Sequence, residues 1–66
     1  MQAIKHFADI EEHIGELASQ MVFASPSRII YEFPSAEAAD VARELVTDYE
    51  PTFFARNNRY FLSLAL

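Results

Sequence analysis

The chain contains no cysteine and only one glycine among its 66 residues. Without cysteine it is neither a disulfide-stapled secreted miniprotein nor a thiolate zinc finger, and it has no thiol nucleophile. A single glycine excludes the glycine-rich loops that cradle phosphate groups. No uncharged run is long enough to cross a bilayer, and no basic and apolar signal segment opens the chain. We therefore expect a soluble protein of a reducing compartment.

The composition is that of one small folded domain spanning 1–66. Apolar residues make up 52%, aromatic residues 14% and charged residues 23% of the chain, which excludes a disordered tail. A chain of this length buries only about 60% of its unfolded surface, so its stability margin is narrow. The net charge of −5 and the pI near 4.7 argue against direct binding to nucleic acid or to an anionic membrane.

The N-terminal third predicts an amphipathic helix. Apolar residues recur at steps of three and four over 3–21. Asp9 and Glu12 form a capping-box pattern, so the main helix starts either near residue 3 or at Asp9. In the second case residues 3–7 form a separate helical turn or a short strand. Gly15 lies inside the pattern, which indicates close packing against a neighbour.

A strand and a second helix follow. The segment 28–33 is β-branched and aromatic, and its alternation places Ile29, Tyr31 and Phe33 on one face. Ser35 is a helix N-cap, and the helix is predicted from residue 36 to about residue 49. The residues of this helix that we expect to be buried are Ala38, Val41, Ala42, Leu45, Val46 and Tyr49.

The C-terminal segment predicts a hairpin. Asn57-Asn58 stands between two aromatic runs, and asparagine tolerates the positive φ of two-residue turns. This turn places Arg56 opposite Arg59, Phe54 opposite Phe61 and Phe53 opposite Leu62. On this register Phe53, Tyr60 and Leu62 face the helices, whereas Phe54 and Phe61 lie on the other face.

The element order is helix, strand, helix, strand, strand. It predicts an α+β fold of two layers, in which a three-stranded antiparallel sheet carries both helices on one face. The last strand is the most apolar, so we place it between the other two. Leu62 and Leu45 are expected in the core.

The charges are distributed unevenly. Residues 1–27 carry a net charge of −3, residues 35–50 carry −4 and the strands carry +2. The acids recur at steps of three and four, which aligns them on the helix faces. This acidic ridge consists of Glu37, Asp40, Glu44 and Asp48 on the second helix and Asp9, Glu12 and Glu16 on the first. It is either an ordinary solvated surface or a docking site for a basic groove on a partner.

The outer face of the sheet is the alternative partner-binding surface, with Phe54, Arg56, Arg59 and Phe61. Two arginines opposite each other require a nearby anion, supplied by Glu32, by the N-terminal segment or by a neighbouring molecule. Aromatic residues beside arginines on an open sheet are also typical of single-stranded RNA platforms. The acidic net charge favours a protein partner or a homodimer contact instead.

Catalytic and metal-binding patterns are not found. His6, Asp9 and His13 could share one helix face, but the two histidines are about 10 Å apart along the axis, too far to bind one ion. His13 is expected to pair with Asp9 or Glu16. No nucleophile elbow is present, and so short a chain has little room for a catalytic cavity. We predict no metal, no cofactor and no enzymatic activity.

The size, the acidity and the acidic segments 8–16 and 35–50 resemble those of small phage-encoded anti-CRISPR proteins. The similarity is to inhibitors of type I effector complexes, and of type I-C in particular. It rests on overall character, because that group has no shared motif. The resemblance implies a non-enzymatic, monomeric inhibitor that binds a Cas subunit in the bacterial cytoplasm and blocks DNA recognition or nuclease recruitment. Arg56 and Arg59 depart from a simple DNA mimic.

Two other classes remain compatible with the sequence. One is a structural or assembly module that dimerises through Phe54 and Phe61. The other is an antitoxin or immunity protein, which would be equally acidic and equally free of motifs.

Overall fold

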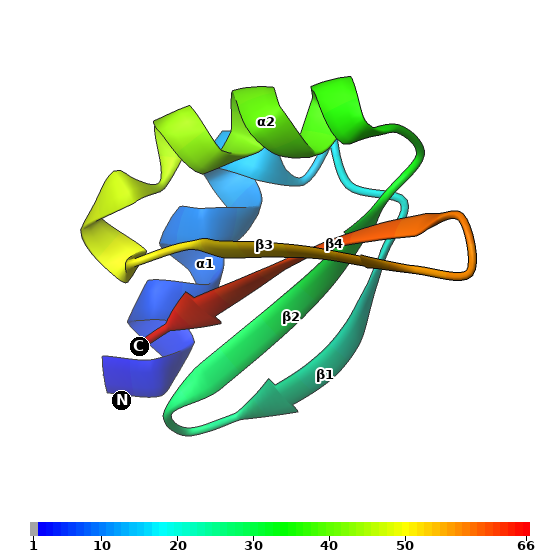
Figure 1. Cartoon of the computed structure of the whole chain (residues 1–66). Helices are drawn as coiled ribbons and strands as arrows, with labels where there is room; N and C mark the ends of the chain where they lie inside the picture. Colours follow the sequence, from blue (N-terminus) through cyan, green and yellow to red (C-terminus); the bar gives the residue numbers. More distant parts are fainter. Residues whose placement is uncertain (1) are drawn as a thin grey trace.

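The structure is a computed structural model that describes the backbone from residue 2 onward and the side chains from residue 8 onward. Figure 1 shows the elements in chain order. They are α1 (Gln2–Ile14), β1 (Gln20–Ser25), β2 (Arg28–Phe33), α2 (Ala36–Leu45), the 3-10 turn η1 (Thr47–Tyr49), β3 (Thr52–Arg56) and β4 (Arg59–Ala65).

The fold is α+β, as predicted, but its sheet has four strands instead of three. The strand order is β1-β2-β4-β3, and all neighbours are antiparallel. The last strand lies between the other two predicted strands, as expected. Because β4 is antiparallel to both of its neighbours, β2 and β3 run parallel and are joined through α2. Both helices lie on the same side of the sheet (Figure 1), where they share one apolar core with it.

The prediction was wrong about the segment after α1. The helix ends at Ile14, and 20–25 form the edge strand β1, which pairs with β2 through a two-residue turn at Pro26-Ser27. The Ser25 hydroxyl accepts a hydrogen bond from the Arg28 amide across this turn. The helical spacing therefore continued by coincidence into Met21, which is 42% exposed on β1. The start of α1 at residue 2 shows that 3–7 are helical.

Gly15 marks the end of α1. A Cβ atom at this position would lie 2.5 Å from the carbonyl oxygen of Glu11, one turn earlier. That carbonyl also accepts the Gly15 amide at 2.8 Å. The close approach expected at Gly15 is therefore to its own preceding turn, which only a residue without a side chain permits.

The second helix is shorter than predicted and presents another side to the sheet. It ends at Leu45, and Thr47–Tyr49 form the separate turn η1. Ser35 caps it as expected, because its side chain accepts the Ala38 amide. Ala39, Ala42 and Val46 are buried, whereas Val41 and Leu45 are about half exposed. The small alanines let α2 approach the sheet closely, and the larger residues are left on its flank.

The C-terminal hairpin follows the predicted register. Asn57 and Asn58 adopt φ values of 53° and 64°, and Phe53 pairs with Leu62, Phe54 with Phe61 and Arg56 with Arg59. Leu62 is fully buried. Phe53 lies on the side of the helices but is 43% exposed, because β3 is an edge strand.

Candidate functional site

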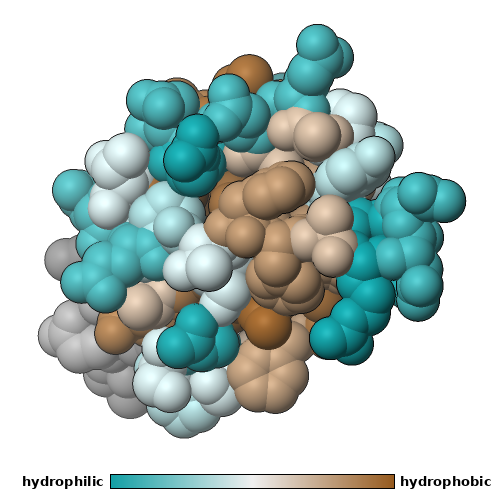
Figure 2. All heavy atoms as spheres, in the orientation of Figure 1, coloured by the Kyte–Doolittle hydropathy of each residue, from teal (hydrophilic) through white to brown (hydrophobic). Residues whose placement is uncertain are grey.

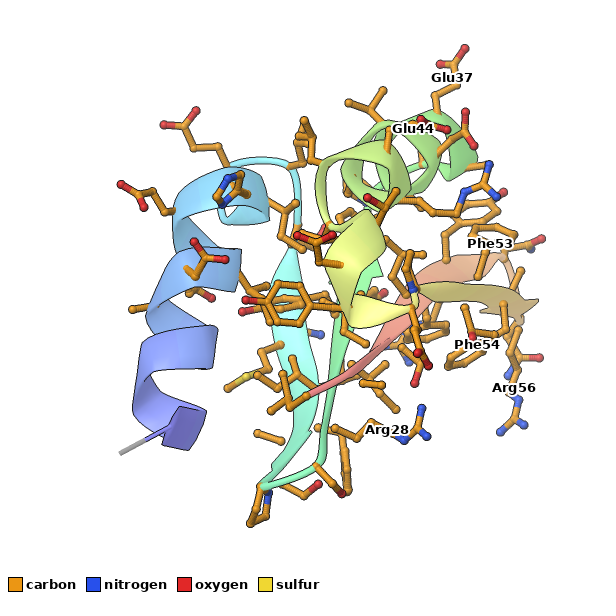
Figure 3. All side chains as sticks on the ribbon, turned by 90° about the vertical axis from the view of Figure 1, so that its left-hand side faces the viewer. Arg28, Glu37, Glu44, Phe53, Phe54 and Arg56 are labelled. Carbon is orange, nitrogen blue, oxygen red and sulfur yellow. The ribbon has the colours of Figure 1, made fainter. Side chains whose placement is uncertain are left out.

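The outward side of α2 and the adjoining turn η1 carry four exposed acids. We call this the α2 acidic surface, and it consists of Glu37, Asp40, Glu44 and Asp48. Figure 3 shows Glu37 and Glu44 pointing away from the sheet. Within the described side chains, Asp40 alone of the four forms an ion pair, with Arg43. The break between α2 and η1 removes Asp48 from the helical row, although Asp48 is still exposed.

The three acids predicted on the first helix differ in their surroundings. Asp9 is half-buried and accepts a hydrogen bond from the Tyr49 hydroxyl at 2.9 Å. The His13 ring donates to the Asp9 carbonyl at 2.7 Å, which raises the pKa of His13. Glu12 is exposed on α1, and Glu16 lies beyond its end. Asp9, which was predicted to lie on the acidic ridge, is therefore bound inside the fold, whereas Glu12 and Glu16 are exposed as predicted.

A hydrogen bond between α1 and the sheet was not foreseen either. The hydroxyl of Tyr31, a residue only 2% exposed, donates to the Glu11 carboxylate at 2.6 Å. Burial and this bond raise the pKa of Tyr31. Glu11 and Asp9 therefore tie α1 to the sheet and to η1. No sequence spacing signalled either pair, because the partners are far apart in the chain.

The outer face of the sheet is not covered by a helix, and apolar side chains occupy its middle. The rings of Phe54 and Phe61 stack with centroids 4.9 Å apart. The β1–β2 register places Phe23, which is 48% exposed, beside Ile30 on this same face. Figure 2 shows apolar residues gathered over β3 and below it, bordered by hydrophilic residues. The sequence did not reveal the contribution of Phe23, because β1 was missed.

The anion required near the two arginines is Glu32, one of the three sources that the sequence left open. Arg59 donates two hydrogen bonds to its carboxylate, at 2.8 and 2.6 Å, and Gln20 donates a third at 3.0 Å. These bonds, that of Arg59 above all, lower the pKa of Glu32 from 4.5 to about 2. Arg59 also lies over the Phe61 ring, 5.6 Å from its centroid. Glu32 and Arg59 thus satisfy each other across β2 and β4.

The remaining cations of the outer face are Arg28 and Arg56. Arg28 donates to the Ser63 hydroxyl, and Arg56 is exposed at the hairpin end of β3. Figure 3 shows both on the side of the sheet away from α1. Neither forms an ion pair with a carboxylate of the described part of the chain.

A pocket of about 330 Å³ lies between α2 and β3. It is lined by Ala36, Asp40 and Arg43 of α2 and by Phe53 of β3. In Figure 3 Phe53 lies directly beneath α2, on the exposed edge of the sheet. This pocket brings the α2 acidic surface next to an apolar edge, a juxtaposition that the sequence did not show.

Among the described residues, no three His, Cys, Asp or Glu residues come together to hold a metal ion. His6, one member of the histidine pair considered above, lies outside the described side chains. No helix in the described part of the chain has the length and hydrophobicity needed to cross a bilayer.

Comparisons with known proteins give no relationship. No family model, no curated protein and no solved structure matches the chain. The function must therefore be argued from the surfaces themselves.

Proposed function

We propose that the chain is a small non-enzymatic binding protein that docks through the α2 acidic surface onto a basic surface of a protein partner. The observation that carries this proposal is the exposure of four acids with one arginine partner among them. Like charges three or four residues apart on a helix destabilise it by roughly a few tenths of a kcal/mol per pair. Such an arrangement is explained when a complementary surface offsets the repulsion on binding.

The partner that fits best is a protein that handles nucleic acid. A groove shaped for phosphate backbone is basic, and a row of carboxylates on a rigid helix complements it. The resemblance to small acidic anti-CRISPR proteins makes the proposal more specific: the partner is a Cas effector subunit in the bacterial cytoplasm. Occupation of its basic groove would block DNA recognition or nuclease recruitment, with no catalytic step.

A double charge reversal tests this proposal. We expect Asp40→Lys with Glu44→Lys to abolish binding to a purified type I-C effector complex, while the circular-dichroism spectrum and the melting temperature stay nearly unchanged. The matched control is Glu12→Lys with Glu16→Lys, which changes the net charge equally but lies outside the α2 acidic surface. Equal loss in both variants would show an effect of net charge, and full binding of the first variant would contradict the proposal.

Salt dependence provides a second test. An exposed electrostatic contact weakens as the Debye length falls from about 10 Å at 0.1 M salt to a few ångströms near 0.5 M. The dissociation constant should therefore rise steadily over this range, mostly through slower association. A constant affinity would indicate that apolar contacts dominate.

The outer face of the sheet supports a second candidate, the dimerising module. The observation in its favour is the exposure of Phe23 and Phe54 on the two edge strands, whereas Phe61 on β4 is only 9% exposed. Four strands spaced by about 4.8 Å give a face about 20 Å wide, and strands of five to seven residues give a similar length. The whole face of one copy, polar residues included, is therefore about 400 Å². A standard interface buries about 800 Å² per partner. The measured mass in solution at micromolar concentration distinguishes monomer from dimer.

A further inference from the structure

The sheet has two open edges, and they differ in their regularity. β1 carries a bulge, where the register with β2 shifts between Met21 and Phe23. Bulges twist an edge strand away from further pairing and protect it. β3 pairs with β4 through an unbroken register from Thr52 to Arg56 and has no bulge. The β3 edge is thus the one to which another strand can add.

The register identifies the backbone groups that β3 leaves open. Arg56 and Arg59 flank the two-residue turn, so they form a hydrogen-bonded pair, and such pairs alternate along an antiparallel ladder. Phe54 and Thr52 therefore direct their amide and carbonyl groups to β4. Those of Phe53 and Ala55 point to the open edge.

The pocket between α2 and β3 lies beside these groups. Phe53 supplies both an outward backbone pair and the apolar wall of the pocket, which Ala36 extends on α2. A strand that paired with β3 would place alternate side chains toward α2, and one of them would enter the pocket. Asp40 also lines this pocket, and Glu44 and Glu37 lie about 40 to 60° further around the helix.

We propose that β3 accepts an extended segment of a partner protein as a fifth strand, with an apolar side chain in the α2–β3 pocket and basic side chains along α2. Strand addition of this kind combines backbone hydrogen bonds with side-chain pockets for specificity. The inference rests on the proposed function, since it names the partner segment that meets the α2 acidic surface. A second copy of the chain fits less well, because pairing two β3 edges would bring two acidic α2 helices together.

The test uses two proline variants at equivalent positions. Ala55→Pro removes an outward amide of the β3 edge. Ala24→Pro removes an outward amide of the β1 edge. The positions are equivalent because Ala24 directly precedes the turn-flanking pair Ser25 and Arg28, and Ala55 directly precedes the turn-flanking pair Arg56 and Arg59. Both alanines are exposed on edge strands, where proline is tolerated. A random peptide library displayed on phage is selected against the full chain, and the enriched peptide is then synthesised.

We expect enriched peptides with basic residues around an apolar anchor. Their affinity should be unchanged for Ala24→Pro and weakened about tenfold or more for Ala55→Pro. In the unmodified chain, the bound peptide should slow hydrogen exchange of the Phe53 and Ala55 amides, a measurement that does not depend on the folding of any variant.

Other results would overturn the proposal. These are full affinity for Ala55→Pro, enrichment of acidic peptides, no enrichment at all, or a dimer in solution that Ala55→Pro dissociates. Binding that survives Ala55→Pro but is lost in Asp40→Lys with Glu44→Lys would reject strand addition and leave the proposed function standing. The reverse pattern would support strand addition and reject the role of the α2 acidic surface.

Discussion

The outer face of the sheet and the α2 acidic surface are both charged, but their acidic side chains differ in ion pairing. On the sheet, Glu32 and Arg59 satisfy each other through two hydrogen bonds. On α2, Glu37 and Glu44 have no ion-pair partner within the described side chains. Glu32 is thus bound within the fold, whereas Glu37 and Glu44 are the acids that we propose contact a partner.

The largest expected effect is a difference in stability loss between a substitution in the core and one on the flank of α2. Leu62 is fully buried in the central strand, so Leu62→Ala should lower the free energy of unfolding by about 2–5 kcal/mol. Leu45 is 48% exposed, so Leu45→Ala should change it by about 0.5 kcal/mol or less. Urea unfolding of both variants measures the contrast, and equal losses would place Leu45 in the core after all.

The next largest loss of stability is expected on removal of the hydrogen bond that ties α1 to the sheet. Tyr31→Phe removes a bond to the Glu11 carboxylate and should cost about 1–2 kcal/mol of stability. Tyr60→Phe is the matched control, because the described structure gives the Tyr60 hydroxyl no hydrogen-bond partner. Thermal unfolding of the two variants tests the prediction, which is wrong if both have the same melting temperature.

A smaller effect is expected at the Glu32–Arg59 pair, and it depends on pH. The folded state lowers the pKa of Glu32 from 4.5 to about 2. A lowered carboxylate pKa stabilises the fold above the unfolded value, and this contribution is lost as the pH falls from about 4.5 to about 2. The stability difference between wild type and Glu32→Gln should therefore shrink over that interval. A constant difference in urea midpoints would contradict the assignment.

The elements that were predicted correctly are those with strong local signals. Asn57-Asn58 determined both the turn and its register, and alternation identified the faces of 28–33. The strand β1 was missed because helical spacing continued past Gly15, although Pro26-Ser27 between two apolar runs is itself a hairpin signal. Leu45 was wrongly predicted to be buried. Tertiary contacts select the alanine side of α2 for the sheet, and the periodicity of the sequence carries no information about those contacts.

The candidate site was predicted only in part. The acids of α2 were identified from spacing alone, since exposed positions on one helix follow from its period. Asp9 was assigned to the same ridge, but its bond to Tyr49 depends on how α1 crosses η1. The pocket beside Phe53 required knowing that β3 is an edge strand next to α2.

The measurement that tests the account most directly compares the two exposed surfaces in one binding assay. Asp40→Lys with Glu44→Lys alters the α2 acidic surface, and Phe54→Ala with Arg56→Ala alters the outer face of the sheet. The account predicts that the first variant loses binding to the effector complex while the second retains it. Full binding by the first variant, together with loss in the second, would move the site to the sheet and contradict the account.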